Sequence, residues 1–210
     1  MNKIMKKRDI KIYDSTLRDG AQTKGVAFSF KDKVRISEIL DDLGVDYIEG
    51  GWPGANPTDD KFFKQSPKFK NAQLVAFGMT RKEGNSAGND PGLNAIINSG
   101  ATSACIVGKT WDFHVRKALK VGLKNNLDMI FDSVNYSSKK LNDVMFDAEH
   151  FFDGYKNNPE YAKKTIEAAY EGGAKWIILC DTNGGTLPFE LESIFEDVSK
   201  IIPFKNLGVH

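Results

Sequence analysis

The chain has 210 residues, of which 40% are hydrophobic and 27% are charged, proportions typical of a folded globular protein. This length allows one sizeable hydrophobic core and does not require two domains. The formal net charge of +1 excludes a general electrostatic attraction to nucleic acid or to acidic membranes. We therefore expect no nucleic-acid partner and no membrane partner.

The apolar runs are short, and none approaches the roughly 18 residues of a membrane span. The N-terminus has no signal-peptide core, and its lysines Lys3, Lys6 and Lys7 are expected to form a solvated tail. Both cysteines, Cys105 and Cys180, lie inside apolar runs. This placement predicts reduced core thiols in a cytoplasmic protein rather than a disulfide.

Short runs rich in β-branched and aromatic residues alternate with stretches of helical periodicity. The runs predict strands at residues 10–13, 47–49, 74–77, 104–107, 144–146, 176–180 and, only beginning, 207–210. A helix is predicted from residue 30 to residue 43, where Gly44 ends it. Another begins at Pro159 with Asn158 as its cap and ends at Gly172. A last amphipathic helix is predicted between the sixth and seventh strands.

Strands that alternate with helices predict parallel pairing and right-handed crossovers. The unit recurs about every 30 residues, which suits a TIM-type (β/α)8 barrel of about 250 residues. An open doubly wound sheet is the alternative, but the glycine-rich loop that usually follows its first strand is not found. We expect one catalytic barrel domain over residues 1–210, incomplete, with six β/α units and the start of strand seven. The chain therefore looks like part of a longer polypeptide.

Active sites of such barrels lie at the carboxyl ends of the strands. The polar residues expected there are Arg18, Asp19 and Gln22 after the first strand, Glu49 after the second, Lys109 after the fourth, Asp147, Glu149 and His150 after the fifth, Asp181 and Thr182 after the sixth, and His210 on the seventh. Carboxylate and imidazole suit a divalent metal, for which Asp19 and His210 are candidate ligands. Arginine holds a carboxylate or a developing oxyanion, and a glutamate can act as acid or base. Together these groups suit chemistry at a 2-oxo acid.

Less specific interpretations stay open. Adjacent Arg and Asp residues in a loop often form only a surface pair. Glu49 could be a strand-end residue in a salt bridge, and His150 fits a hydrogen-bonded packing role slightly better than a ligand role. Cys180 is best explained as core filling.

The segment "DSTLRDGAQ" (residues 14–22) resembles the signature of the DRE-TIM metallolyases, which include isopropylmalate, homocitrate and citramalate synthases, hydroxymethylglutaryl-CoA lyase and related aldolases. The segments "LGVDYIEGGWPGANPTD", "AFGMTR", "DAEHFFDGYKNNPEYA" and "LCDTNGGTLP" resemble the long-chain citramalate synthase branch. The resemblance covers nearly the whole chain.

The resemblance implies a role for each matching residue. Arg18 would stabilise the keto oxygen, Glu149 would assist proton transfer, and Asp19 and His210 would bind a divalent metal, which could be Mg²⁺, Mn²⁺ or Zn²⁺. The residues expected to bind or line the substrate are Gln22, Glu49 and Thr182, together with Arg18.

The implied activity is an acyl transfer from acetyl-CoA to pyruvate that gives citramalate, in isoleucine biosynthesis. An isopropylmalate or homocitrate synthase, a lyase or aldolase of the same family, and an inactive fragment are the alternatives. The family also implies a homodimer, a second strand-seven histidine, and a regulatory domain beyond His210.

Overall fold

The computed structural model describes residues 10–210. Lys3, Lys6 and Lys7 lie outside this range. Seven parallel strands form one sheet, and each strand pairs with the next in sequence order. The strands are β1 (Tyr13–Asp14), β2 (Tyr47–Gly51), β3 (Gln73–Met79), β4 (Ser103–Lys109), β5 (Asp143–Glu149), β6 (Trp176–Leu179) and β7 (Leu207–Val209).

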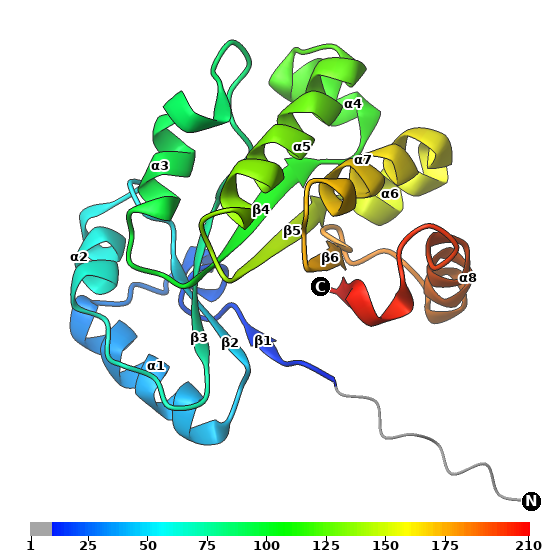
Figure 1. Ribbon diagram of the computed structural model, residues 1–210. Coiled ribbons are helices and arrows are strands. Elements are labelled where there is room, and N and C mark those ends of the chain that lie inside the picture. Colours follow the sequence, from blue (N-terminus) through cyan, green and yellow to red (C-terminus); the bar gives the residue numbers. More distant parts are fainter. Residues whose placement is uncertain (1–9) are drawn as a thin grey trace, which may run out of the picture.

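The α-helices are α1 (Phe30–Leu43), α2 (Pro57–Gln65), α3 (Pro91–Ile97), α4 (Asp112–His114), α5 (Leu123–Ser138), α6 (Phe151–Asn157), α7 (Pro159–Glu171) and α8 (Pro188–Val198). Short 3₁₀ turns are η1 (Gly20–Gln22), η2 (Ala87–Asn89) and η4 (Phe204–Asn206), and η3 (Val115–Leu119) is a π-helical turn. Figure 1 shows the helices around the outside of a curled sheet. No helix of residues 10–210 has the length and apolar character to cross a bilayer.

The sequential strand order confirms the incomplete TIM-type barrel and excludes the doubly wound sheet. A doubly wound sheet reverses its strand order at a switch point, and no reversal occurs among these seven strands. Residues 10–210 supply seven strands of the eight that close such a barrel.

Helix ends follow the predicted signals. The Gly44 backbone adopts φ 87°, a left-handed conformation that suits glycine, and it ends α1 as expected. The Asn158 side chain accepts a hydrogen bond from the Tyr161 amide at 3.2 Å, and Pro159 opens α7 as predicted. These local signals set the lengths of the helices that pack against the sheet.

Two apolar clusters lie on opposite faces of the sheet. The larger one packs between the strands and the outer helices, and Phe62, Phe146 and Phe151 are among its fully buried members. The smaller one fills the barrel interior with Tyr47, Val75, Phe77, Cys105 and Met145. Both cysteines are free and buried, as expected. The interior cluster forms the floor of the cavity described next.

Several strands are longer than the sequence suggested. The prediction ended the fifth strand at residue 146, whereas β5 continues through Asp147 to Glu149. Its polar end still pairs with β4, where Lys109 is the register partner of Glu149. Apolar content therefore underestimated the length of this strand, because the inward side chains at its end face a polar cavity.

Candidate active site

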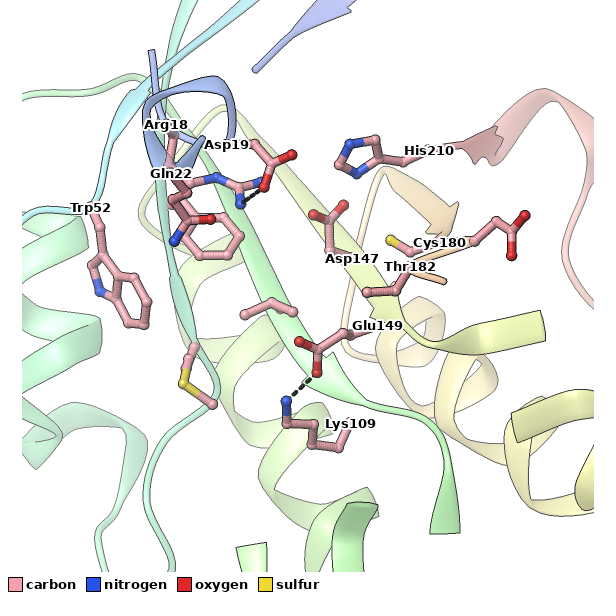
Figure 2. Close-up of a pocket in the computed structure, with 14 residues that line it drawn as sticks. Arg18, Asp19, Gln22, Trp52, Lys109, Asp147, Glu149, Cys180, Thr182 and His210 are labelled. Carbon is pink, nitrogen blue, oxygen red and sulfur yellow. Dashed lines mark hydrogen bonds and ion pairs between the residues drawn. The ribbon is translucent and has the colours of Figure 1, made fainter. Parts of the chain in front are cut away.

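A cavity of about 430 Å³ opens at the carboxyl ends of the strands (Figure 2). Its polar lining comes from five segments of the chain, and Trp52 and apolar side chains of β3 and β4 complete it. The lining residues are Arg18, Asp19, Gln22, Trp52, Phe77, Met79, Val107, Lys109, Asp147, Glu149, Cys180, Asp181, Thr182 and His210. This is the end of the barrel at which the sequence predicted the site.

A tight turn after β1 presents Arg18 and Asp19. The carbonyl oxygen of Ser15 accepts hydrogen bonds from the amides of Arg18, Asp19 and Gly20 at 2.8–3.2 Å. The Leu17 side chain is fully buried, and its packing in the core holds the turn in place. The two charged side chains are therefore held by backbone geometry.

Three contacts fix the Arg18 guanidinium. Its Nε donates to Glu49 Oε2 at 2.7 Å, and its Nη1 donates to Asp19 Oδ1 at 2.9 Å. The guanidinium carbon lies 3.9 Å from the centre of the Phe77 ring. The hydrogen bonds along its edge and the ring contact on its face together fix the orientation of this planar group.

Glu49 lies beneath Arg18, fully buried, and its second oxygen accepts a hydrogen bond from Tyr13 Oη at 2.7 Å. Burial raises the pKa of Glu49 to about 7, against the opposing effect of Arg18. Glu49 is not part of the cavity wall. Its effect on a ligand would act through Arg18, and the predicted direct substrate contact stays a prediction.

Asp147 faces the cavity from β5 and is 6% exposed. Burial raises its pKa to about 6, while the Cys105 thiol and Arg18 act in the opposite direction. Arg18 thus faces three carboxylates, because Asp147 joins Asp19 and Glu49 around it. One guanidinium cannot neutralise three acids, so this part of the cavity carries excess negative charge.

Glu149 and Lys109 form an ion pair on neighbouring strands at the cavity wall. The backbone oxygen of Glu149 also accepts a hydrogen bond from Thr110 Oγ1 at 2.7 Å. The pair places a proton acceptor beside a cation within the same cavity. That arrangement suits acid–base work on a bound ligand.

The loop after β6 positions Thr182, whose Oγ1 accepts a hydrogen bond from the His150 amide at 2.9 Å. His150 Nδ1 lies 3.0 Å from Asp153 Oδ2, so this side chain has the hydrogen-bonded packing role that the sequence favoured. The Asp181 carboxylate accepts hydrogen bonds from Gly185 and Thr186 and stabilises its own loop. Thr182 is therefore the residue of this loop with a hydroxyl at the cavity.

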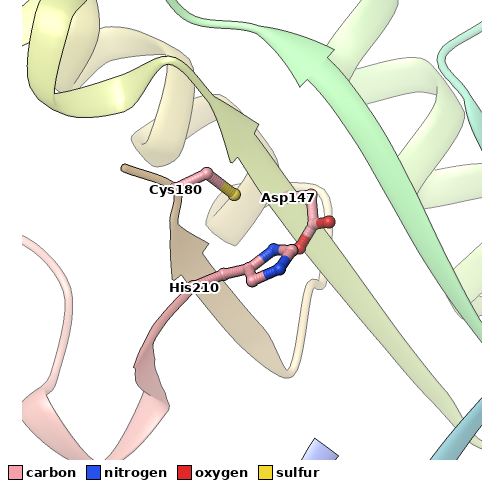
Figure 3. A group of neighbouring side chains, drawn as sticks. All are labelled: Asp147, Cys180 and His210. Carbon is pink, nitrogen blue, oxygen red and sulfur yellow. The ribbon is translucent and has the colours of Figure 1, made fainter. Parts of the chain in front are cut away.

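His210 follows β7 and points toward Asp147 and Cys180 (Figure 3). One potential ligand atom from each of these three residues lies within 4.8 Å of the others. Carboxylate, thiolate and imidazole are all metal ligands in proteins, so the residues present fit a divalent cation. The role of Asp19 as a ligand stays a prediction, and its carboxylate lies beside Arg18 at the same cavity.

The structure brings six of the seven predicted site residues to one cavity, with Glu49 directly below it. The sequence placed Lys109 and Asp147 at this end of the barrel without a role, and it did not predict Trp52 or Cys180 as lining residues. Asp147 lies two positions before Glu149, and residues two apart share one face of a strand. That spacing was the available signal. Cys180 was interpreted as core filling, yet it also lines the cavity.

This fold, with its cavity at the carboxyl ends of the strands, defines a domain of the parallel β/α-barrel class. The chain belongs to the HMGL-like family, whose model matches residues 9–210.

Five curated (R)-citramalate synthases are 45–53% identical to the chain. The one from Aquifex aeolicus is 53% identical over 201 residues, which are 95% of this chain and 38% of that protein. A 2-isopropylmalate synthase from Sulfurisphaera tokodaii is 30% identical over 203 residues, 97% of this chain and 50% of that protein. The chain thus spans about two fifths of the length of the citramalate synthases.

Among solved structures, the Bacillus subtilis HMG-CoA lyase superposes with a TM-score of 0.78 at 21% identity. The match covers 97% of this chain and 68% of the lyase chain. At this identity the superposition supports the barrel fold alone.

Proposed function

We propose that the protein to which this chain belongs is an acyltransferase that condenses acetyl-CoA with pyruvate to give citramalate. The observation that carries the proposal is Arg18, fixed by Glu49 and Phe77 at a cavity wall that also presents carboxylates and His210. The identity to (R)-citramalate synthases supports this reaction over the related ones. The cytoplasmic location and the homodimer predicted from the sequence are parts of the same proposal.

Arg18 would orient the 2-oxo acid and stabilise negative charge on its keto oxygen. Nε and Nη1 are engaged by Glu49 and Asp19, so Nη2 is the guanidinium nitrogen left for a ligand among the described contacts. A donor fixed in advance stabilises a developing oxyanion without reorganising during the reaction. Thr182 offers a hydroxyl at the same cavity for the substrate carboxylate.

A divalent metal, when bound, would supply Lewis acidity toward the oxygens of the 2-oxo acid. Asp19 and His210 would hold it, as the family resemblance implies, and Asp147 and Cys180 lie beside His210 with further potential ligand atoms.

Proton transfer is assigned to Glu149. A base removes a proton from the acetyl methyl group, and the resulting carbanion forms a bond to the keto carbon. The keto oxygen gains the electron pair and then a proton, and hydrolysis of the thioester releases CoA. Lys109 keeps the Glu149 carboxylate at the cavity wall, where Glu149 can give the proton that it took up to the new alkoxide oxygen.

Two related activities use the same cavity. An isopropylmalate or homocitrate synthase would differ in the pocket for the side chain of the 2-oxo acid, and the lower identity to a 2-isopropylmalate synthase counts against it. A lyase or aldolase would break the same kind of bond instead of forming it. A fragment without activity is the remaining alternative, because the chain spans only part of its relatives.

The test is a free-thiol assay on the full-length polypeptide with acetyl-CoA and a series of 2-oxo acids. The proposal expects CoA release with pyruvate at least about tenfold faster than with 2-oxoisovalerate, as one side-chain pocket can discriminate by that factor. Preference for 2-oxoisovalerate would support the isopropylmalate alternative. No thiol release with any 2-oxo acid would contradict the proposal.

A further inference from the structure

The loops after β5 and β6 are joined beside the cavity by two hydrogen bonds of His150. Its amide donates to Thr182 Oγ1 at 2.9 Å, and its Nδ1 lies 3.0 Å from Asp153 Oδ2. A carboxylate oxygen accepts hydrogen bonds, so Nδ1 carries the hydrogen of the second contact. Asn183 Nδ2 donates to the same Asp153 oxygen at 2.9 Å. One carboxylate oxygen therefore connects the residue after β5 to the residue after Thr182.

The backbone of His150 has an unfavourable conformation. Its φ of 54° and ψ of 36° lie in the left-handed region, and among residues 10–210 Lys120 is the other non-glycine residue with a positive φ. Such a conformation persists only where the surrounding contacts hold it, and it is most common at functional sites. Here it lets the amide of His150 reach the β6 loop while the ring reaches Asp153 in the first turn of α6.

The loop after β4 holds the other side of the His150 ring. The His114 ring stands edge-on to it, at 89° and 4.6 Å between ring centres, and the Trp111 ring lies 6.1 Å away. The His150 side chain is 17% exposed as a result of this packing. Its imidazole is thus fixed by an acceptor on one side and by aromatic rings on the other.

These contacts leave the Thr182 hydroxyl as a free donor. Its oxygen accepts from His150, and within residues 10–210 its own hydrogen has no acceptor. Thr182 lines the cavity (Figure 2). Because one lone pair of the oxygen is occupied, the O–H group has fewer directions available and can point to a ligand in the cavity. A carboxylate gains most from such a donor, since charged acceptors form the stronger hydrogen bonds.

We propose that His150 and Asp153 are positioning residues for the 2-oxo acid. Asp153 holds the His150 ring and Asn183, and the His150 amide fixes Thr182 as a donor to the substrate carboxylate. The inference rests on the proposed function, because it takes a 2-oxo acid as the ligand of this cavity. Neither His150 nor Asp153 lines the cavity, so both act through Thr182.

The test is the dissociation constant of pyruvate for the full-length polypeptide, measured by calorimetry without acetyl-CoA so that no turnover occurs. Thr182→Val removes the donor and should raise this constant about 10- to 100-fold, the effect of one hydrogen bond to a charged group. Asp153→Ala should raise it about tenfold, at the lower end of that range. Glu167→Ala, at an exposed acid of α7, is the control and should leave the constant unchanged.

Two further variants separate positioning from a general effect on the stability of α6. Asp153→Asn keeps an oxygen that can accept from both donors, so its dissociation constant should stay within about twofold of the wild-type value. In a Thr182→Val background, Asp153→Ala should add less than about twofold, because the positioned donor is already gone. Asn183→Ala breaks the same contact from an exposed loop and should behave like Asp153→Ala in both backgrounds, even if Asp153→Ala fails to fold.

An unchanged constant in Asp153→Ala, a full loss of affinity in Asp153→Asn, or equal effects with and without Thr182→Val would overturn the inference. The proposed function fails separately. Pyruvate binding that depends on Asp153, without citramalate formation, contradicts the reaction alone. Citramalate formation with a pyruvate affinity that does not depend on Asp153 contradicts the inference alone, and no pyruvate binding by the wild type contradicts both.

Discussion

The Nε atom of Arg18 donates to Oε2 of Glu49 across 2.7 Å, inside a barrel interior where the glutamate is fully buried. Tyr13 Oη donates a hydrogen bond to the other carboxylate oxygen at 2.7 Å, and the Phe77 ring packs against the face of the guanidinium. Both ends of the ion pair are thus fixed without substrate. Arg18 is a preorganised cation, and Glu49 is the residue that positions it.

Replacing Arg18 by lysine should preserve the charge and remove the planar fork. An ammonium cannot engage Glu49 through an edge nitrogen while another nitrogen faces the ligand. We expect turnover of the full-length polypeptide to fall about 10²- to 10³-fold, the loss typical of one oxyanion donor. Steady-state CoA release measures this. Arg35→Lys, at a side chain 74% exposed on α1, is the control and should leave the rate unchanged. Equal rates for Arg18→Lys and wild type would contradict the assigned role.

The raised pKa of Glu49 predicts a pH-dependent stability. At pH values between 4.5, its ordinary pKa, and about 7, its pKa in the folded chain, the folded chain keeps a proton on Glu49 that the unfolded chain has released. The folded state then binds more protons, so stability falls as pH rises through this window. Across this pH window, the free energy of unfolding should fall by on the order of 1–3 kcal/mol more in the wild type than in Glu49→Gln.

Urea unfolding at about pH 5 and about pH 8 measures this difference, since the two conditions lie on either side of the shifted pKa. Glu38→Gln, at an exposed carboxylate of α1, is the matched control and should follow the wild type. If the free energies of unfolding of wild type and Glu49→Gln changed in parallel with pH, burial would not shift the pKa of Glu49.

A buried ion pair supports the loop after β2. Lys33 of α1 pairs with Asp59 of α2 and also donates to the Gly50 oxygen at 2.9 Å. Asp59 in turn accepts the Trp52 amide at 2.8 Å, which holds a residue of the cavity wall. Gly51 has φ 145°, and a Cβ there would lie 2.5 Å from the Asp59 carboxylate, so the loop also needs this glycine.

Lys33→Met should reduce the free energy of unfolding by about 3–5 kcal/mol, because it leaves the Asp59 carboxylate buried without its cation. Denaturant titration checks the value. Lys31→Met, at an exposed position of the same helix, should change stability by less than about 0.5 kcal/mol. Adding Asp59→Asn to Lys33→Met should recover part of the loss. A loss for Lys33→Met no larger than that of Lys31→Met would contradict the role of the pair.

Alternation of apolar runs and helical stretches sufficed to predict the barrel, since each unit carries its own local signals. Strand ends could not be located in this way. Lys109 and Glu149 pair in register on β4 and β5, yet charged residues at strand ends resemble loops in a single sequence.

Most of the site could be predicted because β/α barrels place functional residues at the carboxyl ends of their strands. The different positions of Arg18, at the cavity, and Glu49, beneath it, could not be predicted. The turn after β1 and the stretch after β2 gave no sign that Glu49 lies under Arg18 and not at the cavity wall. The position of Cys180 at the cavity could not be predicted for a related reason. A buried thiol in a strand has the same local sequence pattern whether it fills the core or lines a cavity.

The central claim is that the cavity around Arg18 serves a carbon–carbon bond-forming acyl transfer. The most direct measurement is product analysis of the full-length polypeptide supplied with pyruvate and acetyl-CoA carrying a ¹³C-labelled methyl group. The account predicts one labelled citramalate for each CoA released, and loss of both products in Arg18→Ala. Thiol release without labelled citramalate, or unchanged product in Arg18→Ala, would contradict it.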